Sequence, residues 1–529
     1  MFVRELGLAV IACLACVEFA SAASNSTVIL ICLDGFRWDY MGKADTPNLD
    51  FIAKTGVHAP YVKNVFPTVT MPNLYTIVTG LYPESHGIIA NEMFDPEFGA
   101  VFDSNNNETR WWNGGEPVWI TNQKHGFKSG TSFWPGFDVA IQGYFPSFST
   151  NGTEYSKPFA SKTNLMPVKE RIDTVVKWLT RGSPPTFVAM YFLQPDNVGN
   201  EHGPDSPEIE AAIRHFDKNI TGYLLDQLRQ VELLDEVNII VTSDHGMTGY
   251  NTSHFVNFDN IVNASAYETW SGNEAFFTIQ PHPDKEGYVY DNLKEEARKT
   301  KLFEVYKKED VPDDLHFKHN RRIGSIVGLL KEGWYARSSK LPQGNYSFGV
   351  IRGNNGYSTT IKDMYPFFIA RGPAFKENLT TEPFEIIDIY PLICHILGIE
   401  PAPNNGSLAR VKGLFKELPQ PTENTTSTNA PTESTTEKQR SGNRIVKIAG
   451  FVILGFAGLV SLVASILLII RWCKRQNRPK KLIWQEEEED ETAANTATVD
   501  HADDMVPNQE EPVENNDETA ALRVQEIQV

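Results

Sequence analysis

The chain has 529 residues, of which 41% are hydrophobic, so it is long enough for one large α/β enzyme core or for two to three average domains. Its formal net charge of −19 argues against nucleic-acid binding through a basic face. With only five cysteines, it is not a small scaffold held together by disulfides.

The N-terminus has the composition of a secretory signal peptide. Arg4 supplies a charged region, an apolar stretch runs from Leu6 to Val17, and Ala20-Ser-Ala22 offers small residues for cleavage. We therefore expect residues 1–22 to be a signal peptide. Residues 24–415 contain no Pro/Ser-rich linker, and we expect them to form one continuous ectodomain.

Three short apolar runs each lead into an aspartate. They are Thr27–Leu33 before Asp34, Phe187–Leu193 before Asp196, and Val237–Thr242 before Asp244 and His245. Short runs that are rich in Val and Ile and lack polar alternation are typical of buried strands in a parallel sheet. Reactive groups of open α/β sheets collect beyond the carboxyl ends of the strands, so we expect these carboxylates to meet at one edge.

Apolar residues at helical spacing predict helices over Val168–Thr180 and Ile209–Leu228, and each helix precedes one of the apolar strands. This alternation predicts an α/β fold with a mostly parallel central sheet and helices on both faces. We expect a late helix over Ile387–Leu397. The less regular region 246–370 leaves room for a small inserted subdomain.

One hydroxyl and one amide are candidate functional groups beside the carboxylates. Thr70 begins the string Thr70-Met-Pro-Asn73, and Pro72 favours a helix start nearby. A helix N-terminus favours a bound phosphate, and Thr70 needs a metal or a base to become a nucleophile. Asn91 has an amide that can donate to a phosphoryl oxygen. Taken singly, each of these residues is more often a helix cap or a turn residue.

The C-terminal quarter predicts a membrane anchor. Residues 417–444 are rich in Thr, Ser, Pro and Glu, which is typical of an O-glycosylated stalk. The uncharged run Ile448–Ile470 is long enough for one transmembrane helix, and basic residues follow it. All ten Asn-x-Ser/Thr sequons precede this run. We therefore expect a single-pass type I protein of the plasma membrane with an N-glycosylated extracellular part and an acidic, disordered cytoplasmic tail over 471–529.

Several ordered strings make the resemblance to one family specific. They are Leu33-Asp-Gly-Phe-Arg-Trp-Asp39, Phe66-Pro-Thr-Val-Thr70-Met-Pro-Asn73, the segment 77–89, Trp134-Pro-Gly136, Ser243-Asp-His-Gly-Met247, the segment 370–375 and Cys394-His-Ile-Leu-Gly398. Together they resemble the ectonucleotide pyrophosphatase/phosphodiesterase family, which has the alkaline phosphatase-like fold. The layout is similar to that of the short type I membrane members.

The resemblance implies a phosphodiesterase with two zinc ions that acts on a nucleotide or another small phosphodiester. One zinc would be held by Asp34, Asp244 and His245 and would contact the nucleophile Thr70. Thr70 would attack phosphorus, form a phosphoenzyme and be released by water, while Asn91 steadies the phosphate. Met71 stands where the family usually has a phenylalanine that stacks on the base.

The second zinc site departs from the family pattern. The motif Asp-x-x-Gly-His-x-x-Gly-Pro has become Asp196-Asn-Val-Gly-Asn200-Glu-His-Gly-Pro204, and a second expected histidine is Asn355. Neutral amides are poor zinc ligands, so Asp196 lies in a degenerate site. Two ways to bind a cation at this site remain open. His202 could turn in, or a hard cation such as Ca²⁺ or Mg²⁺ could use the oxygen ligands.

Two functions therefore compete. One is a pseudoenzyme-like binding role, with phosphodiester hydrolysis impaired or lost because one metal half-site is intact and the other is not. The alternative is an active metal-dependent ecto-phosphodiesterase that hydrolyses phosphodiester or pyrophosphate bonds through Thr70. A weaker third reading is a signalling role through the acidic tail, whose cytoplasmic partner the sequence does not identify.

Overall fold

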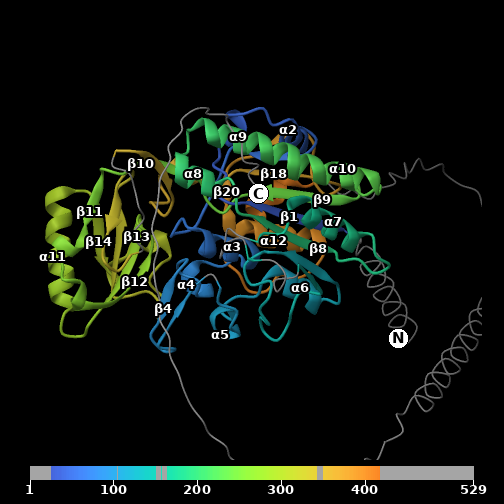
Figure 1. Ribbon diagram of the computed structural model, residues 1–529. Helices are drawn as coiled ribbons and strands as arrows, with labels where there is room; N and C mark the ends of the chain where they lie inside the picture. Colours follow the sequence, from blue (N-terminus) through green and yellow to red (C-terminus); the bar gives the residue numbers. More distant parts are fainter. Residues whose placement is uncertain (1–25, 104, 151–155, 158–163, 342–348, 417–529) are drawn as a thin grey trace, which may run out of the picture. The chain divides into compact units, whose positions relative to one another are not determined.

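The computed structural model describes residues 26–416, except for 104, 151–155, 158–163 and 342–348 (Figure 1). The expected signal peptide, stalk, transmembrane run and tail lie outside the described residues. Across the described ranges, no helix has both the length and the apolar character needed to cross a bilayer. These residues belong to one unit of the chain.

The three apolar runs form neighbouring strands of an eight-stranded sheet. β1 (Thr27–Leu33) pairs in parallel with β8 (Phe187–Phe192) on one side and with β9 (Val237–Thr242) on the other. Only β18 runs against its neighbours β9 and β2, so the expectation of a mostly parallel sheet is confirmed for the part of the chain described. Its other strands are β19 (Leu379–Thr380), β2 (Val57–Ala59), β18 (Phe368–Arg371), β6 (Ser129–Ser132) and β7 (Phe148–Ser149).

Both faces of this sheet are covered because the side chains of β1 alternate between two apolar cores. Val28, Leu30 and Cys32 belong to one core, and Ile29, Ile31 and Leu33 belong to the other. Fully burying one such aliphatic side chain contributes about 1.5–3 kcal/mol, which explains why the strand lacks polar alternation. The first core packs α3 (Thr70–Thr79), α6 (Val118–Lys124) and α12 (Ile389–Leu397), and the second packs α2 (Pro47–Lys54), α7 (Val168–Leu179), α9 (Pro207–Phe216) and α10 (Tyr223–Gln230).

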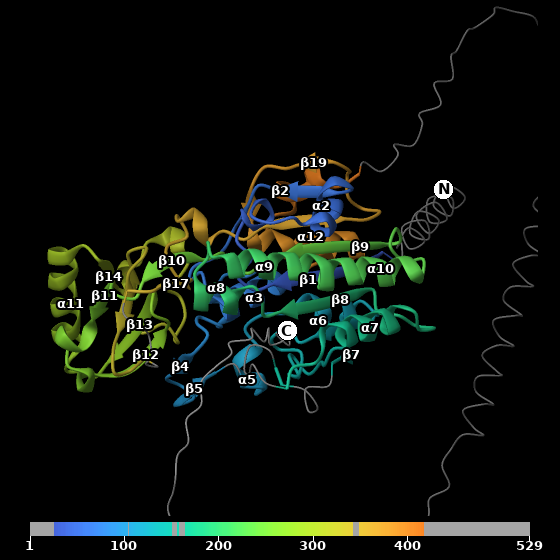
Figure 2. The same cartoon turned by 45° about the horizontal axis from the view of Figure 1, so that its top comes forward.

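The expected helices are present, with one difference. α7 and α12 match the expected positions closely. The single helix expected over 209–228 is a run of α9, a π-helical stretch over Asp217–Gly222, and α10 (Figure 2). The π-helical stretch lies where Asp217 accepts hydrogen bonds from the backbone N–H groups of Asn48 and Leu49, which ties it to the first turn of α2.

The region 246–370 contains a smaller subdomain with its own core. Its sheet has the order β12 (Tyr267–Gly272), β13 (Phe276–Pro281), β15 (Ile326–Leu330) and β14 (Phe303–Lys307), all antiparallel. α11 (Glu286–Thr300) packs on this sheet, and Figure 1 shows the group beside the main sheet. Two short ribbons accompany it, β10 (Thr248–Asn251) with β17 (Ile351–Asn354) and β11 (Phe255–Asn257) with β16 (Tyr335–Arg337).

The ribbon of β10 and β17 links the subdomain to the edge of the main sheet. Thr248 pairs with Asn354, so the residue after β17, Asn355, is brought beside the loop that carries His245. Two further short pairs complete the described strands, β4 (Met93–Asp95) with β5 (Ala100–Phe102) and β3 (Val62–Lys63) with β20 (Phe384–Glu385). The remaining α-helices of the described residues are the short ones α4 (Pro83–His86), α5 (Thr109–Trp112), α8 (Asp196–His202) and α13 (Leu408–Val411).

A buried histidine connects α4 to α3. The Nδ1 atom of His86 accepts a hydrogen bond from the Ile88 N–H at 3.1 Å, so the proton lies on Nε2, which is 3.0 Å from the Thr76 hydroxyl. Burial lowers the pKa of His86 to about 3, which keeps the ring neutral in the folded protein. Protonation would place a second proton against the Ile88 N–H.

From the buried, neutral state of His86 we predict that the free energy of unfolding decreases in acid. The unfolded chain binds a proton near the ordinary pKa of 6.5, whereas folded His86 does so only near 3. The stabilisation is therefore complete above pH 6.5 and declines as the pH falls, by about 2 kcal/mol at pH 5. In urea titrations of the full-length chain between pH 7 and pH 5, His86→Gln should lose less stability than the wild type by this amount. His319→Gln, at an exposed position, should keep the wild-type slope, and an unchanged slope in His86→Gln would contradict the buried neutral state.

Candidate functional site

Three carboxylates meet at the carboxyl edge of the main sheet. Asp34 follows β1, Asp244 follows β9, and Asp196 begins α8 after β8. Because β1 lies between β8 and β9, the three strand ends are adjacent. Asp34 is 1% exposed and Asp196 is 8% exposed, and Asp244 is fully buried. Their charges therefore interact in a region with little water.

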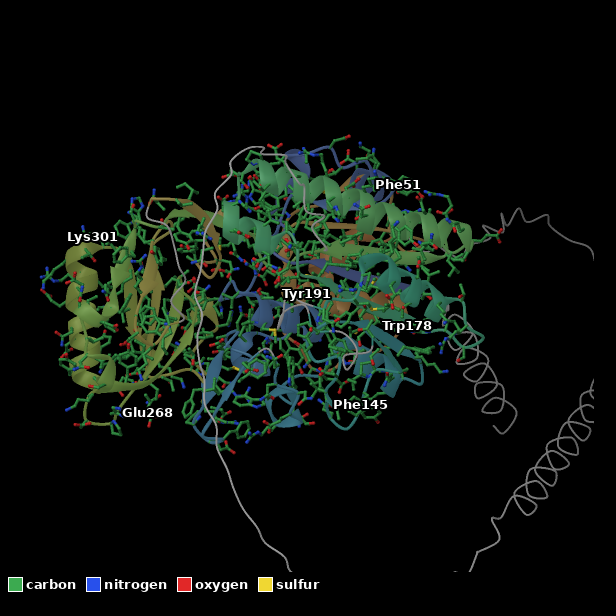
Figure 3. The ribbon with its side chains drawn as sticks, viewed as in Figure 1. Phe51, Phe145, Trp178, Tyr191, Glu268 and Lys301 are labelled. Atoms are coloured by element: carbon green, nitrogen blue, oxygen red, sulfur yellow. The ribbon has the colours of Figure 1, made fainter. Side chains whose placement is uncertain are left out.

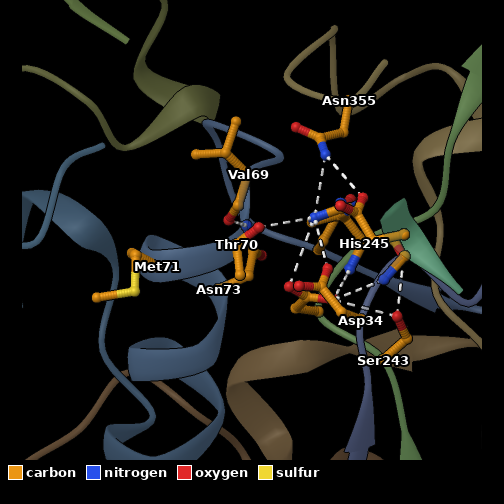
Figure 4. A network of polar contacts seen from close by, with 12 residues as sticks. Asp34, Val69, Thr70, Met71, Asn73, Ser243, His245 and Asn355 are labelled. Atoms are coloured by element: carbon orange, nitrogen blue, oxygen red, sulfur yellow. Dashed lines mark hydrogen bonds and ion pairs between the residues drawn. The ribbon is translucent and has the colours of Figure 1, made fainter. Parts of the chain in front are cut away.

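His245 points its Nε2 into this group (Figure 4). Its Nδ1–H donates to the Gly246 carbonyl oxygen at 2.7 Å, which holds the ring with Nε2 toward the carboxylates. Nε2 lies 3.3 Å from Asp34 Oδ1 and 3.5 Å from Asp244 Oδ2. A histidine held at one nitrogen by a backbone carbonyl, with the other nitrogen directed at carboxylates, has the arrangement of a metal ligand.

The two buried carboxylates have one oxygen each that no hydrogen bond reaches within the described structure. These atoms are Asp34 Oδ1 and Asp244 Oδ2, the same two that face His245. The second oxygen of Asp34 accepts from the Tyr191 hydroxyl, and Asp244 Oδ1 accepts from the backbone N–H groups of Gly35 and His245. Burial, followed by the charges of Asp244 and Asp196, raises the pKa of Asp34 well above its usual range. A cation would relieve this repulsion.

Thr70 is held beside the same nitrogen at the first residue of α3. Its hydroxyl lies 3.2 Å from His245 Nε2. Asn73, one turn further, fixes the approach to the helix, because its Oδ1 accepts from the Val65 N–H and its Nδ2 donates to the carbonyls of Pro67 and Val69. The helix begins at Thr70, two residues before the expected start at Pro72. The helix start therefore lies at the same place as the hydroxyl, with the Asn73 N–H donating to the Val69 carbonyl at 3.3 Å.

Met71 and Asn91 are linked through the backbone. The Met71 N–H donates to Asn91 Oδ1 at 2.8 Å, so the Asn91 side chain lies next to the helix start. The Met71 side chain is buried in the apolar core and extends away from the carboxylates (Figure 4). In this structure Met71 therefore contributes its backbone N–H to the site region and its side chain to packing.

The residues at this half of the site suit one divalent cation. Asp34, Asp244 and His245 supply two oxygens without hydrogen bonds and the Nε2 atom of the imidazole, which is a donor set that zinc accepts. When bound, the ion would supply positive charge next to the Thr70 hydroxyl. Asp196 lies close as well, since ligand atoms of Asp34, Asp196 and His245 fall within 4.8 Å of one another.

The other half of the site has amides where imidazoles were expected. Asn200 Nδ2 donates to Asp196 Oδ2 at 2.6 Å, and Asn355 Nδ2 lies 3.5 Å from Asp196 Oδ1 and 3.2 Å from His245 Nε2. The His202 side chain is 42% exposed and lies 3.9 Å from a Glu201 oxygen, so it does not replace the missing ligands here. Donor N–H groups surround Asp196, and this half does not fit a second cation.

Two residues of the site were missed by the sequence analysis. Tyr191 lies in β8 opposite Cys32 of β1, and only this register shows that its hydroxyl reaches Asp34. Figure 3 places Tyr191 inside the main domain. Asn273, in the turn between β12 and β13, contacts Asn355 from the inserted subdomain. No sequence signal links positions 82 residues apart in this way.

Comparisons with known proteins identify the family of this chain. The family model described as type I phosphodiesterase / nucleotide pyrophosphatase matches residues 28–358. The chain belongs to this family. Human ectonucleotide pyrophosphatase/phosphodiesterase family member 5 is 38% identical over 400 residues, which cover 75% of this chain and 80% of the relative. The bis(5'-adenosyl)-triphosphatase of Xenopus laevis is 37% identical over 419 residues, which cover 78% and 88%.

Solved structures of the family show the same fold. Human and murine member 5 each give a TM-score of 0.68 at 38% identity and cover 74% of this chain and 100% of theirs. One murine structure is an inactive variant in complex with AMP. The chain therefore has the alkaline phosphatase-like α/β fold of a family of zinc-dependent phosphodiesterases.

The contact between Tyr191 and Asp34 predicts a loss of metal affinity. Tyr191→Phe removes the hydroxyl that orients Asp34, and outer contacts of this kind are worth about 10–100-fold in affinity. We expect zinc affinity, measured by competition with a chelator on the full-length chain, to fall within that range. Tyr40→Phe is the matched control, because its buried hydroxyl makes no hydrogen bond in the described structure. Equal affinities in the two variants would exclude the orienting role.

Proposed function

We propose that this chain is a membrane-anchored ectodomain that binds nucleotide phosphoesters at a one-cation site and has impaired or lost hydrolysis. The proposal rests on the groups that surround the Asp196 carboxylate. Both of its carboxylate oxygens face amide nitrogens, from Asn200 at 2.6 Å and from Asn355 at 3.5 Å. These amides stand where the family pattern has two histidines.

The loss of a second cation weakens catalysis more than binding. In two-metal sites, one ion assists the attacking oxygen and the other assists the leaving oxygen of an in-line displacement. A neutral N–H group carries only part of the charge that an ion brings to the transition state. Binding a phosphate in the ground state needs less positive charge than stabilising the transition state. Interactions that are equally strong in the ground state and the transition state do not accelerate the reaction.

The residues of this chain that remain are suited to binding. The Thr70 hydroxyl stands at the N-terminus of α3, 3.2 Å from His245 Nε2, and a helix N-terminus favours a phosphate group. Asn91 is placed to steady the phosphate through the helix start. The AMP complex of murine member 5 supports a nucleotide as the class of ligand.

The cell-surface location is part of the proposal and rests on the sequence. The signal peptide, the apolar run 448–470 and the one-sided sequons support a type I protein of the plasma membrane. The sequon asparagines Asn107, Asn263, Asn378 and Asn405 are exposed, as N-glycan attachment requires. We name no partner for the cytoplasmic tail.

An active ecto-phosphodiesterase is the second candidate. The 3.2 Å contact between the Thr70 hydroxyl and His245 Nε2 favours it, because nucleophile and cation ligand are already adjacent. A relative named bis(5'-adenosyl)-triphosphatase also favours it. The two candidates differ in metal content and in the dependence of turnover on Thr70.

The deciding experiment restores the two histidines. The wild type should hold about one zinc per chain by elemental analysis and should turn over a chromogenic nucleotide phosphodiester no faster than Thr70→Ala. The double variant Asn200→His/Asn355→His should hold about two, with turnover raised at least about tenfold, because even indirect ligand contacts contribute 10–100-fold. Adding Thr70→Ala to it should abolish the gained turnover.

Asn197→His is the matched control, since it adds an imidazole to the same helix at the residue directly after Asp196 and not one turn further, where Asn200 lies. It should hold one zinc and show no gain. Two zinc ions in the wild type, or wild-type turnover that Thr70→Ala removes, would replace the proposed function by the second candidate.

A further inference from the structure

The amide of Asn355 is held in one orientation by a residue of the inserted subdomain. Asn273 Nδ2 donates to the Asn355 backbone carbonyl at 3.0 Å and to Asn355 Oδ1 at 3.3 Å. Asn273 lies in the turn between β12 and β13, whereas Asn355 follows β17. The contact therefore joins two different loops at the edge of the site.

The direction of both amides follows from backbone groups whose roles are fixed. The N–H groups of Ala275 and Phe276 donate to Asn273 Oδ1 at 3.0 and 2.9 Å. Because an N–H can only donate, this atom of Asn273 must be the oxygen, and the Nδ2 of Asn273 must face Asn355. The atom of Asn355 that faces Asn273 is then its oxygen. Its nitrogen consequently faces Asp196 and His245.

The backbone next to Asn355 is also held by contacts, so a movement of this loop does not carry the side chain away from Asp196. On one side the Gly356 N–H donates to the Thr68 carbonyl at 2.9 Å, and the Thr68 hydroxyl donates to the Tyr357 carbonyl at 2.8 Å. On the other side a Cβ at Gly356 would lie 2.7 Å from Asn273 Oδ1, and its φ of +95° suits glycine alone. Glycine thus lets the two loops approach closely.

We propose that Asn273 is a positioning residue that holds Asn355 with its N–H groups toward Asp196, so that this half of the site excludes every cation, hard ones included. The inference rests on the proposed one-cation function and deepens it. Zinc is excluded by the loss of imidazoles, and Ca²⁺ or Mg²⁺ is excluded by orientation. These ions need oxygen ligands, and an amide offers its oxygen only when its nitrogen points elsewhere.

Asn200 does not impose the same restriction. Its hydrogen bond runs from Nδ2 to Asp196 Oδ2, and the acceptor alone sets that direction. A cation bound to Asp196 would favour the opposite rotamer, with the Asn200 oxygen inward. Asn355 is therefore the group that decides whether the oxygens of residues 196, 200 and 355 can converge.

Asn273→Asp tests this inference with a nearly isosteric change. One carboxylate oxygen keeps the bonds from Ala275 and Phe276, and the other repels Asn355 Oδ1 and attracts its nitrogen. Asn355 should turn its oxygen toward Asp196. We expect half-saturation by CaCl₂ or MgCl₂, measured as the cation-dependent rise of the Tm of the zinc-loaded full-length chain, at a concentration at least tenfold lower than in the wild type. Zinc content should stay at about one per chain.

Three variants separate this effect from others. Asn257→Asp makes the same change at an amide whose Oδ1 accepts a turn N–H from Asp259 in the same subdomain, and it should respond to calcium as the wild type does. Asn273→Asp/Asn355→Leu should lose the gain. Asn273→Ser, which keeps an oxygen for the turn and is too short to reach Asn355, should show a smaller gain and serves if Asn273→Asp does not fold.

The results have distinct meanings. A calcium response in Asn273→Asp and Asn273→Ser equal to that of the wild type would overturn the inference and leave the one-zinc proposal intact. A gain that survives Asn355→Leu would overturn it too, because the new site would not involve Asn355. Two zinc ions in the wild type would overturn the proposed function itself.

Discussion

Asp34, Asp196 and Asp244 are carried to one point by three neighbouring strands, and the repulsion among their buried charges is the constraint that the surrounding residues satisfy. A parallel sheet makes this arrangement unavoidable, because its strand ends meet at one edge. Leaving three carboxylates in a nearly dry region without positive charge or hydrogen-bond donors costs several kcal/mol per uncompensated charge. The residues around the site can each be explained by how they reduce this electrostatic cost.

The two halves of the site compensate the buried carboxylate charges in different ways. Around Asp34 and Asp244, one oxygen of each carboxylate has no hydrogen bond and His245 directs Nε2 toward both, which are the features of a cation site. Around Asp196, amide N–H groups from Asn200 and Asn355 face the oxygens. Hydrogen bonds to a charged acceptor are strong, so amides can stabilise Asp196 in the folded protein. They cannot supply the charge that phosphoryl transfer requires of a second ion.

The inserted subdomain has a direct role in this difference. It does not supply a carboxylate, but the loop after β17 brings Asn355 to the site and the turn after β12 sets its direction. A family fold with zinc chemistry is thereby combined with a local hydrogen-bond network that opposes a second ion. In the proposed function, the exclusion of a second ion depends on the orientation of one side-chain amide, which Asn273 holds.

Most of the fold was predictable because its signals are local. The strand β1 begins and ends where its apolar run does, and α7 follows from helical spacing, since burial on both sheet faces and on one helix face selects residue types directly. The π-helical stretch was not predictable, because it depends on how Asp217 meets the N-terminus of α2. Tyr191 was hidden for a similar reason, since strand register decides its contact with Asp34.

The sequence by itself determined the family, the carboxylates and His245 at the strand ends, and the replacement of two histidines by Asn200 and Asn355. The tertiary structure alone decided which atoms of those asparagines face Asp196, that His202 turns to solvent, and that Asn273 takes part. The physical reason is that residue type fixes which donors and acceptors exist. Their direction is fixed only by partners that the folded chain brings from distant positions.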